Sequence, residues 1–251
     1  MNNSVPRLRM FAGPNGSGKS TLKTVLRPEL IGIYLNPDEV GNQIEQNGFL
    51  DLASYNITTT VTELSDFLRE STLLTTKKLT YLADNLQIEN GRLTSQVNTN
   101  ELPYFVSALA DFIRRTWLKN KISFTFETVM SARDKVGFLK EAQAAGYRTY
   151  LYYICTNDPE INVPRVKFRF SQGGHDVPRD KIVSRYHRSL DLLFDAIGFT
   201  NRAYIFDNSG EGTGHTWIAE ITDGKTLTLK TESVPVWFTH SVIDKRTSIQ
   251  S

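Results

Sequence analysis

The chain has 251 residues, 39% of them hydrophobic, and a formal net charge of +2. This length allows one large domain with a full core, and the near-neutral charge excludes a general affinity for polyanions. The single cysteine, Cys155, excludes a disulfide framework. No stretch reaches the ~18 apolar residues of a membrane span. The first residues lack the apolar segment of a secretory signal. We therefore expect a cytoplasmic protein.

A phosphate-binding motif lies near the start of the chain. Residues 13–21 satisfy G-x-x-x-x-G-K-[ST], the P-loop pattern, between a predicted strand at 7–12 and a helix predicted from 21–26. In such a loop the glycines let successive N–H groups face phosphate oxygens, the lysine brings charge to the β- and γ-phosphates, and the serine is suited to hold Mg²⁺. We predict ATP and Mg²⁺ as ligands, Ser20 as the metal ligand and Lys19 as a catalytic residue as well. The predicted nucleotide-binding residues are Gly13, Pro14, Asn15, Gly16, Ser17, Gly18, Lys19, Ser20 and Thr21.

Strand-like segments alternate with helical ones along much of the chain. This alternation predicts an α/β fold, a mostly parallel sheet flanked by helices, within a single domain over residues 1–251. A helix is expected at 134–145, where Gly146 ends it. The expected strands are 7–12, 31–35, 122–126, 149–155 and 203–206.

Two regions depart from this alternation. Residues 41–121 contain no convincing strand, and helical spacing of apolar residues at 65–86 and 104–118 predicts a mostly helical insertion, with a polar loop over 89–100. We expect this insertion to form a wall or cover of a substrate cleft. In residues 215–231, an Asp-Gly pair lies between two alternating segments and predicts a C-terminal β-hairpin.

Asp38 is the first candidate for chemistry outside the loop. It follows the second expected strand in the segment Asn36-Pro37-Asp38-Glu39, and ligands of such sheets bind beyond the carboxyl ends of the strands. Asp38 could accept the proton of an attacking hydroxyl. It could also be the N-cap of the helix that starts there. We predict the catalytic role, and one residue can perform both.

Glu127 ends the third expected strand and points to the same edge of the sheet. It could bind an acceptor hydroxyl, or Mg²⁺ through a water molecule. Alternatively, it caps a helix or pairs with an arginine. Asp207 follows the last expected strand, and there we expect its side chain to close a turn.

Residues 164–188 are locally basic and carry a Gly-Gly pair at 173–174. We interpret them as a lid, with one helix ending near Phe170, a glycine hinge and a second helix from Arg179 to Phe194. Closure of such a lid excludes water and neutralises charge on the transferring phosphoryl group. Arg165 and Arg169 are four residues apart, so they share a helix face. The alternative is a solvated basic surface.

Together these segments resemble the zeta-toxin family of bacterial kinases over roughly residues 7–210. The resemblance implies a P-loop kinase fold and phosphorylation of uridine-diphosphate-N-acetylglucosamine on a sugar hydroxyl, with a small helical antitoxin as inhibitor. The segments that carry it are residues 13–21, Asn36-Pro37-Asp38-Glu39, Phe126-Glu127-Thr128, Arg165-x-x-x-Arg169, Gly173-Gly174-His175-Asp176-Val177-Pro178 and Arg185-Tyr186-His187-Arg188-Ser189-Leu190.

By matching position, the resemblance implies a role for each candidate. Asp38 is the general base, Arg165 and Arg169 are catalytic lid arginines, and Glu127 contacts the sugar. The other implied acceptor-binding residues are Asp38, Thr128, Arg179 and Arg185. The family members that act on the nucleotide sugar have Gly and Thr after the glutamate, whereas this chain has Thr128-Val129. The departure leaves the acceptor open.

Two other functions stay open. A nucleotide-switched binding module would need switch loops and a residue that orients water, for which the sequence offers no obvious candidate. A kinase of nucleic-acid ends would need basic residues interleaved with aromatic ones outside the lid, and residues 41–121 are not enriched in this pattern. We therefore expect a small-molecule substrate, with neither a nucleic-acid nor a membrane partner.

Overall fold

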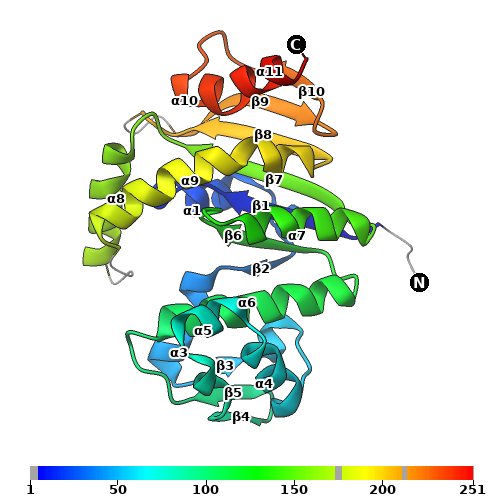
Figure 1. Cartoon of the computed structure of the whole chain (residues 1–251), viewed down its shortest axis with the longest axis vertical. Coiled ribbons are helices and arrows are strands. Elements are labelled where there is room, and N and C mark those ends of the chain that lie inside the picture. The colour runs from blue at the N-terminus through cyan, green and yellow to red at the C-terminus, as the bar shows by residue number, and fades with distance from the viewer. Residues whose placement is uncertain (1–4, 173–176, 211–213, 251) are drawn as a thin grey trace. The chain divides into compact units, whose positions relative to one another are not determined.

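The computed structural model describes residues 5–172, 177–210 and 214–250, and the chain forms two compact units. The first unit comprises the residues up to Gly32 and those from Ser123 onward, and the second comprises Ile33–Ile122. Both are shown in Figure 1.

The first unit contains a mixed sheet with helices on both faces. It contributes six strands in the order β10-β9-β8-β7-β1-β6. Pairing is parallel from β6 through β1 and β7 to β8, and antiparallel from β8 through β9 to β10. The strands are β1 (Arg7–Ala12), β6 (Phe124–Thr128), β7 (Arg148–Cys155), β8 (Arg202–Asp207), β9 (Thr216–Thr222) and β10 (Thr226–Leu229).

Figure 1 shows α7 and α9 on the near face of this sheet and α1 behind it. Large apolar side chains of the strands face these helices. Leu8, Met10 and Leu151 are fully buried. The helices of the first unit are α1 (Lys19–Val25), α2 (Pro28–Ile31), α7 (Arg133–Ala144), α8 (Pro159–Ser171), α9 (Arg179–Gly198), α10 (Val236–Phe238), the π-helical turn η3 (Thr239–Ile243) and α11 (Asp244–Gln250).

Local sequence signals explain several element ends. Gly146, at φ 81°, follows the end of α7, as expected for a C-terminal glycine. Asp223 and Gly224 have φ of 50° and 64° in the tight turn between β9 and β10, whose pairing begins at Thr222 and Thr226. Cys155 is fully buried, and burial raises the pKa of its thiol to about 12, so this cysteine is a core residue.

The second unit corrects the expectation that residues 41–121 contain no strand. Besides helices it has a three-stranded antiparallel sheet in the order β3-β5-β4. Asn90 and Gly91, which fall in the predicted polar loop, form the tight turn between β4 and β5 with φ of 52° and 79°. Because both turn residues need positive φ, Asn-Gly is a hairpin signal, and the strands beside it are too short to show a long period-2 pattern.

The core of the second unit forms around α6. Trp117 on this helix is fully buried, and its Nε1 donates a hydrogen bond to Tyr55 O at 2.7 Å. The elements are β2 (Ile33–Leu35), α3 (Pro37–Asn47), β3 (Leu50–Asp51), η1 (Ala53–Tyr55), α4 (Val61–Arg69), α5 (Thr72–Lys77), η2 (Thr80–Ala83), β4 (Leu86–Glu89), β5 (Arg92–Ser95) and α6 (Leu102–Lys119).

Candidate nucleotide-binding site

The P-loop joins the end of β1 to the start of α1. Gly13 has a φ of 143°, and a Cβ there would lie 2.0 Å from the carbonyl oxygen of Ile154 on β7. Only glycine therefore lets the loop leave the sheet this close to the neighbouring strand. Helix α1 begins at Lys19, so its N-terminal N–H groups and positive dipole end belong to the predicted phosphate site.

Lys19 is held inside the loop. Its side chain is 7% exposed, and Nζ donates hydrogen bonds to the carbonyl oxygens of Gly13 and Pro14, both at 2.9 Å. The loop therefore keeps an ammonium group beside its own backbone. A positive charge, backbone N–H groups and a helix N-terminus together suit a polyphosphate.

Ser20 and Glu127 meet although they are 107 residues apart in sequence. The parallel register aligns Phe11 with Glu127, so β6 ends beside the point where β1 enters the loop. Ser20 Oγ lies 3.2 Å and 3.1 Å from the two carboxylate oxygens of Glu127, which is 7% exposed. A hydroxyl and a carboxylate are the oxygen ligands that Mg²⁺ prefers, and Mg²⁺ usually keeps several waters. These two residues therefore fit Mg²⁺, although no cluster of three or more His, Cys, Asp or Glu side chains exists among the described residues.

Arg165 is connected to the P-loop through Asn208, a residue that sequence reasoning missed. Arg165 Nη1 donates to Asn208 O at 2.8 Å, and Asn208 Nδ2 donates to Ser17 O, also at 2.8 Å. Asn208 directly follows β8 at the carboxyl edge of the sheet, where ligands of such sheets bind. This position is the feature of the sequence that could have marked it as a site residue. His215 adds a contact between its Nε2 and Gly18 O at 3.1 Å.

The other predicted lid residues lie in different surroundings. Arg169 is half-buried one turn after Arg165 on α8. Arg179 forms an ion pair with Glu160, and both side chains are at least half exposed. Arg185 is half-buried on α9. The glycine hinge and its neighbours, Gly173, Gly174, His175 and Asp176, lie outside the described residues.

Asp38 lies in the second unit, at the second residue of α3. Asn36, not Asp38, is the N-cap, because Asn36 Oδ1 accepts a hydrogen bond from the backbone N–H of Asp38 at 3.0 Å. The capping alternative for Asp38 is therefore wrong. The Asp38 side chain is exposed.

Thr128 and Asp207 both close turns at strand ends. Thr128 Oγ1 accepts from Met130 N–H at 3.1 Å, and Met130 has a φ of 52°. Asp207 accepts from the backbone N–H and the hydroxyl of Ser209, at 2.9 Å and 2.8 Å, as we expected. These contacts shape the loops beside the site.

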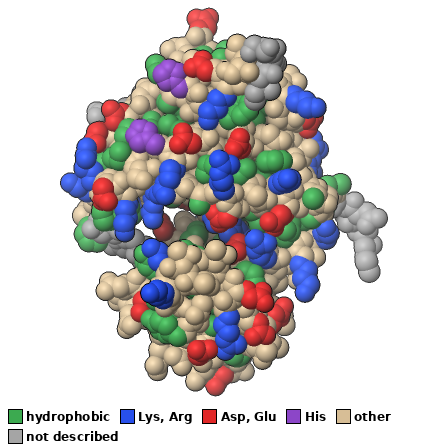
Figure 2. Space-filling view, viewed as in Figure 1, with side chains coloured by type: hydrophobic (Ala, Val, Ile, Leu, Met, Phe, Trp, Pro, Cys, Tyr) green, Lys and Arg blue, Asp and Glu red, His purple; other side chains and the backbone are tan. Residues whose placement is uncertain are grey.

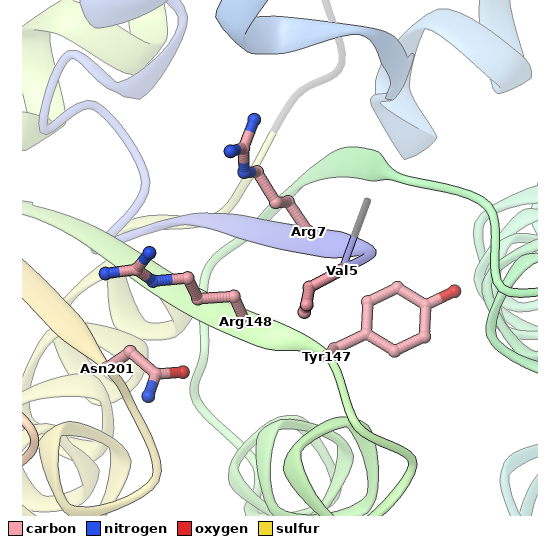
Figure 3. Close-up of a pocket in the computed structure, with 5 residues that line it drawn as sticks. All are labelled: Val5, Arg7, Tyr147, Arg148 and Asn201. Atoms are coloured by element: carbon pink, nitrogen blue, oxygen red, sulfur yellow. The ribbon is translucent and has the colours of Figure 1, made fainter. Parts of the chain in front are cut away.

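A separate cavity lies at the opposite edge of the sheet. Figure 3 shows its lining residues, Val5, Arg7, Tyr147, Arg148 and Asn201. Arg7 and Arg148 begin β1 and β7, whereas the P-loop follows the other end of β1. This cavity contains none of the predicted site residues. Figure 2 shows acidic and basic side chains interspersed on the visible face of the first unit, in keeping with the small net charge.

A family comparison matches much of the first unit and the end of the second. The model of the family described as zeta toxin matches residues 89–211. This segment is similar to the zeta-toxin family. The zeta-toxin match includes Glu127, Arg165 and Asn208, and it begins after the P-loop and Asp38.

Several solved structures are similar to this chain in fold. In AvrRxo1-ORF1:AvrRxo1-ORF2 with sulphate ions, one chain has a TM-score of 0.55 at 14% identity, over 92% of this chain and 62% of that chain. The corresponding complex with ATP also gives a TM-score of 0.55. A structure from the PezAT chromosomal toxin-antitoxin system of Streptococcus pneumoniae gives 0.53 at 12% identity, over 100% and 85% of the two chains. These similarities show that the chain shares the α/β fold of these proteins.

One curated protein from Haemophilus influenzae is 35% identical over 69 residues. It is described as an uncharacterized protein, and the match covers 28% of this chain and 49% of that protein. The chain therefore matches about half of this relative and less than two thirds of the AvrRxo1-ORF1:AvrRxo1-ORF2 chain. In the described part of this chain, no helix is long and apolar enough to cross a membrane.

Proposed function

We propose that the protein is an ATP-dependent kinase that transfers the γ-phosphoryl group to a hydroxyl of an acceptor. The observation that carries this proposal is the contact between Ser20 and Glu127 beside a P-loop that holds Lys19. The zeta-toxin match supports it. A solved structure of similar fold that is described as a complex with ATP also supports it.

In the proposed reaction the acceptor oxygen attacks the γ-phosphorus, and the bond from that phosphorus to the bridging oxygen of ADP breaks. Asp38 takes the proton of the acceptor hydroxyl. Lys19 and the α1 N-terminus hold the phosphates, and Arg165 and Arg169 neutralise charge that spreads over the phosphoryl oxygens. Bound Mg²⁺ would supply positive charge to the phosphates, with Ser20 and Glu127 as the residues that hold it.

Glu127 fits the metal side of this site better than the acceptor side, because its carboxylate faces the Ser20 hydroxyl. We retain Thr128, Arg179 and Arg185 as predicted acceptor contacts. The proposed acceptor is a nucleotide sugar such as uridine-diphosphate-N-acetylglucosamine, supported by the zeta-toxin match. The toxin-antitoxin system named for the Streptococcus pneumoniae structure supports a protein antitoxin as a partner.

The test is a search for the phosphorylated product. The purified chain is incubated with ATP, Mg²⁺ and a panel of nucleotide sugars, simple sugars, nucleosides and short RNAs, and mass spectrometry detects the gain of one phosphoryl group. We expect uridine-diphosphate-N-acetylglucosamine to gain it. Asp38→Asn should lose at least about 100-fold in turnover, as for the loss of a general base.

The matched control is Asp244→Asn, because Asp244 is also an exposed aspartate in the first turn of a helix. Its turnover should equal that of the wild type. Phosphorylation of another small molecule would change the proposed acceptor but support the proposed kinase activity. Phosphorylation of RNA alone would favour a nucleic-acid kinase. ATP hydrolysis that survives in Asp38→Asn, without any acceptor product, would contradict the proposal and favour a nucleotide-switched module.

A further inference from the structure

Three buried polar atoms around the P-loop have no hydrogen-bond partner among the described residues. They are Asn15 Oδ1, Ser17 Oγ and Asn162 Nδ2. Asn15 and Ser17 belong to the loop, whereas Asn162 lies on α8 and is fully buried. Buried polar groups are normally paired, because an unpaired one loses its water without gaining a partner. Their concentration at one loop indicates that these groups serve the bound state.

Asn162 lies directly against the loop. Gly16 has a φ of 76°, and a Cβ on it would lie 2.7 Å from the carbonyl oxygen of Asn162 and 3.1 Å from its Cβ. Helix α8 therefore occupies the space that a side chain at position 16 would need. Asn15 is the chain neighbour of Gly16, so the two residues with open amide atoms flank the same glycine.

The Asn162 side chain is oriented by one hydrogen bond. Thr156 Oγ1, just after β7, donates to Asn162 Oδ1 at 2.8 Å. This bond leaves Nδ2 as the open donor, while Asn15 presents an open acceptor, Oδ1. The two open atoms are chemically complementary. Asn162 also lies one helical turn before Arg165, on the same face of α8.

We propose that Asn162 is a positioning residue that couples the phosphate loop to the arginine helix. In the nucleotide-bound loop, Asn162 Nδ2 donates a hydrogen bond to Asn15 Oδ1, and this bond fixes α8, with Arg165, against the loop. The inference rests on the proposed binding of ATP. Asn15 belongs to the P-loop pattern, whereas no motif of the sequence marks Asn162.

A double-mutant cycle tests the pairing. The affinity for a non-hydrolysable ATP analogue with Mg²⁺ is measured by calorimetry for the wild type, Asn15→Ala, Asn162→Ala and the double variant. Each single variant should bind about five-fold more weakly, the equivalent of one hydrogen bond. The double variant should bind no more weakly than the singles, because both remove the same bond. Independent effects that multiply to about 25-fold in the double variant would overturn the pairing.

Thr156→Val tests whether the orientation of the Asn162 amide matters. It removes the hydrogen bond that orients Asn162 but leaves Nδ2 in place, so its affinity should fall, by no more than in Asn162→Ala. A Thr156→Val loss that persists at full size in the Asn15→Ala background would assign the effect to packing and overturn the inference. Asn162→Ala should also raise the KM for ATP in the phosphoryl-transfer assay.

The failure of this inference differs from the failure of the proposed function. A wild-type chain that binds no ATP analogue would overturn both. In another outcome, the wild type binds ATP and transfers the phosphoryl group, while Asn162→Ala and Asn15→Ala bind the ATP analogue as tightly as the wild type. That result would overturn this inference alone. If Asn162→Ala does not fold, Asn15→Ala still tests the proposal, because it removes the acceptor of the same hydrogen bond.

Discussion

At the scale of single residues, the candidate site depends on pairs of residues that lie very close together. Gly13 faces the Ile154 carbonyl, Gly16 faces Asn162, and Ser20 faces Glu127. The first two contacts need a missing side chain, and the third needs a short hydroxyl opposite a carboxylate. The P-loop pattern predicts which residue types stand at these positions. It does not identify Ile154, Asn162 or Glu127 as their partners, because those residues lie on other elements, β7, α8 and β6.

Gly13→Ala tests the steric requirement directly. A methyl group 2.0 Å from the Ile154 oxygen, at a φ of 143°, forces the loop or β7 to move. We expect the free energy of unfolding to fall by about 2–3 kcal/mol, a strong effect for one methyl group. ATP binding should fall as well. Thermal denaturation and calorimetry measure the two effects.

Gly137→Ala is the matched control for that substitution. Gly137 lies inside α7, and a Cβ there would meet no atom within 4 Å. Because alanine favours helix over glycine, we expect this variant to gain up to about 1 kcal/mol of stability. A Gly13→Ala protein as stable as Gly137→Ala would contradict the steric account.

At the scale of elements, short local signals decide where helices and hairpins begin. Asp223-Gly224 and Asn90-Gly91 both place two successive residues at positive φ in a hairpin turn. The first turn is predicted because a seven-residue alternating strand, β9, precedes it, whereas both strands beside the second, β4 and β5, are only four residues long. In the segment Asn36-Pro37-Asp38, two residues could each cap α3, and only the backbone geometry distinguishes Asn36 as the cap.

This assignment separates stability from catalysis in α3. Asn36→Ala removes the side chain that accepts the Asp38 N–H and should lower the free energy of unfolding by about 1 kcal/mol. Asp38→Asn keeps that cap, so it should lose less stability than Asn36→Ala while losing phosphoryl transfer. Urea denaturation with the product assay distinguishes the two. A larger loss of stability in Asp38→Asn would show that the carboxylate has a structural role.

At the scale of the whole molecule, the sheet buries several tyrosines along with its apolar residues. Burial raises the pKa of Tyr147 and Tyr152 to about 12, and it raises the pKa of Tyr153 and Tyr186 as well. Tyr147 also packs edge-to-face on Phe124, with ring centroids 6.1 Å apart. The folded chain therefore keeps these phenols neutral at a pH where the unfolded chain ionises them.

The stability of the protein should consequently fall at alkaline pH. Below the ordinary tyrosine pKa of 10, both states are protonated and the full stability is present. Between pH 10 and 12, the unfolded chain loses protons that the folded chain retains, so stability decreases as the pH rises through the folded pKa. The measurement is Tm from pH 8 to 12. Tyr147→Phe should show a shallower fall, and an unchanged slope would contradict the role of this phenol.

The sequence by itself determined the features that depend on neighbouring residues: the P-loop, the alternation that predicts an α/β fold, the glycine that ends α7 and the Asp-Gly turn. It also identified Glu127 as a candidate, although not its contact. Tertiary structure alone decided that Ser20 meets Glu127, that Asn208 links Arg165 to Ser17, and that Asn162 supports Gly16. The reason is physical. Local patterns act through backbone geometry within a few residues, whereas these contacts depend on the order in which β6, β1, β7 and β8 pair in the sheet.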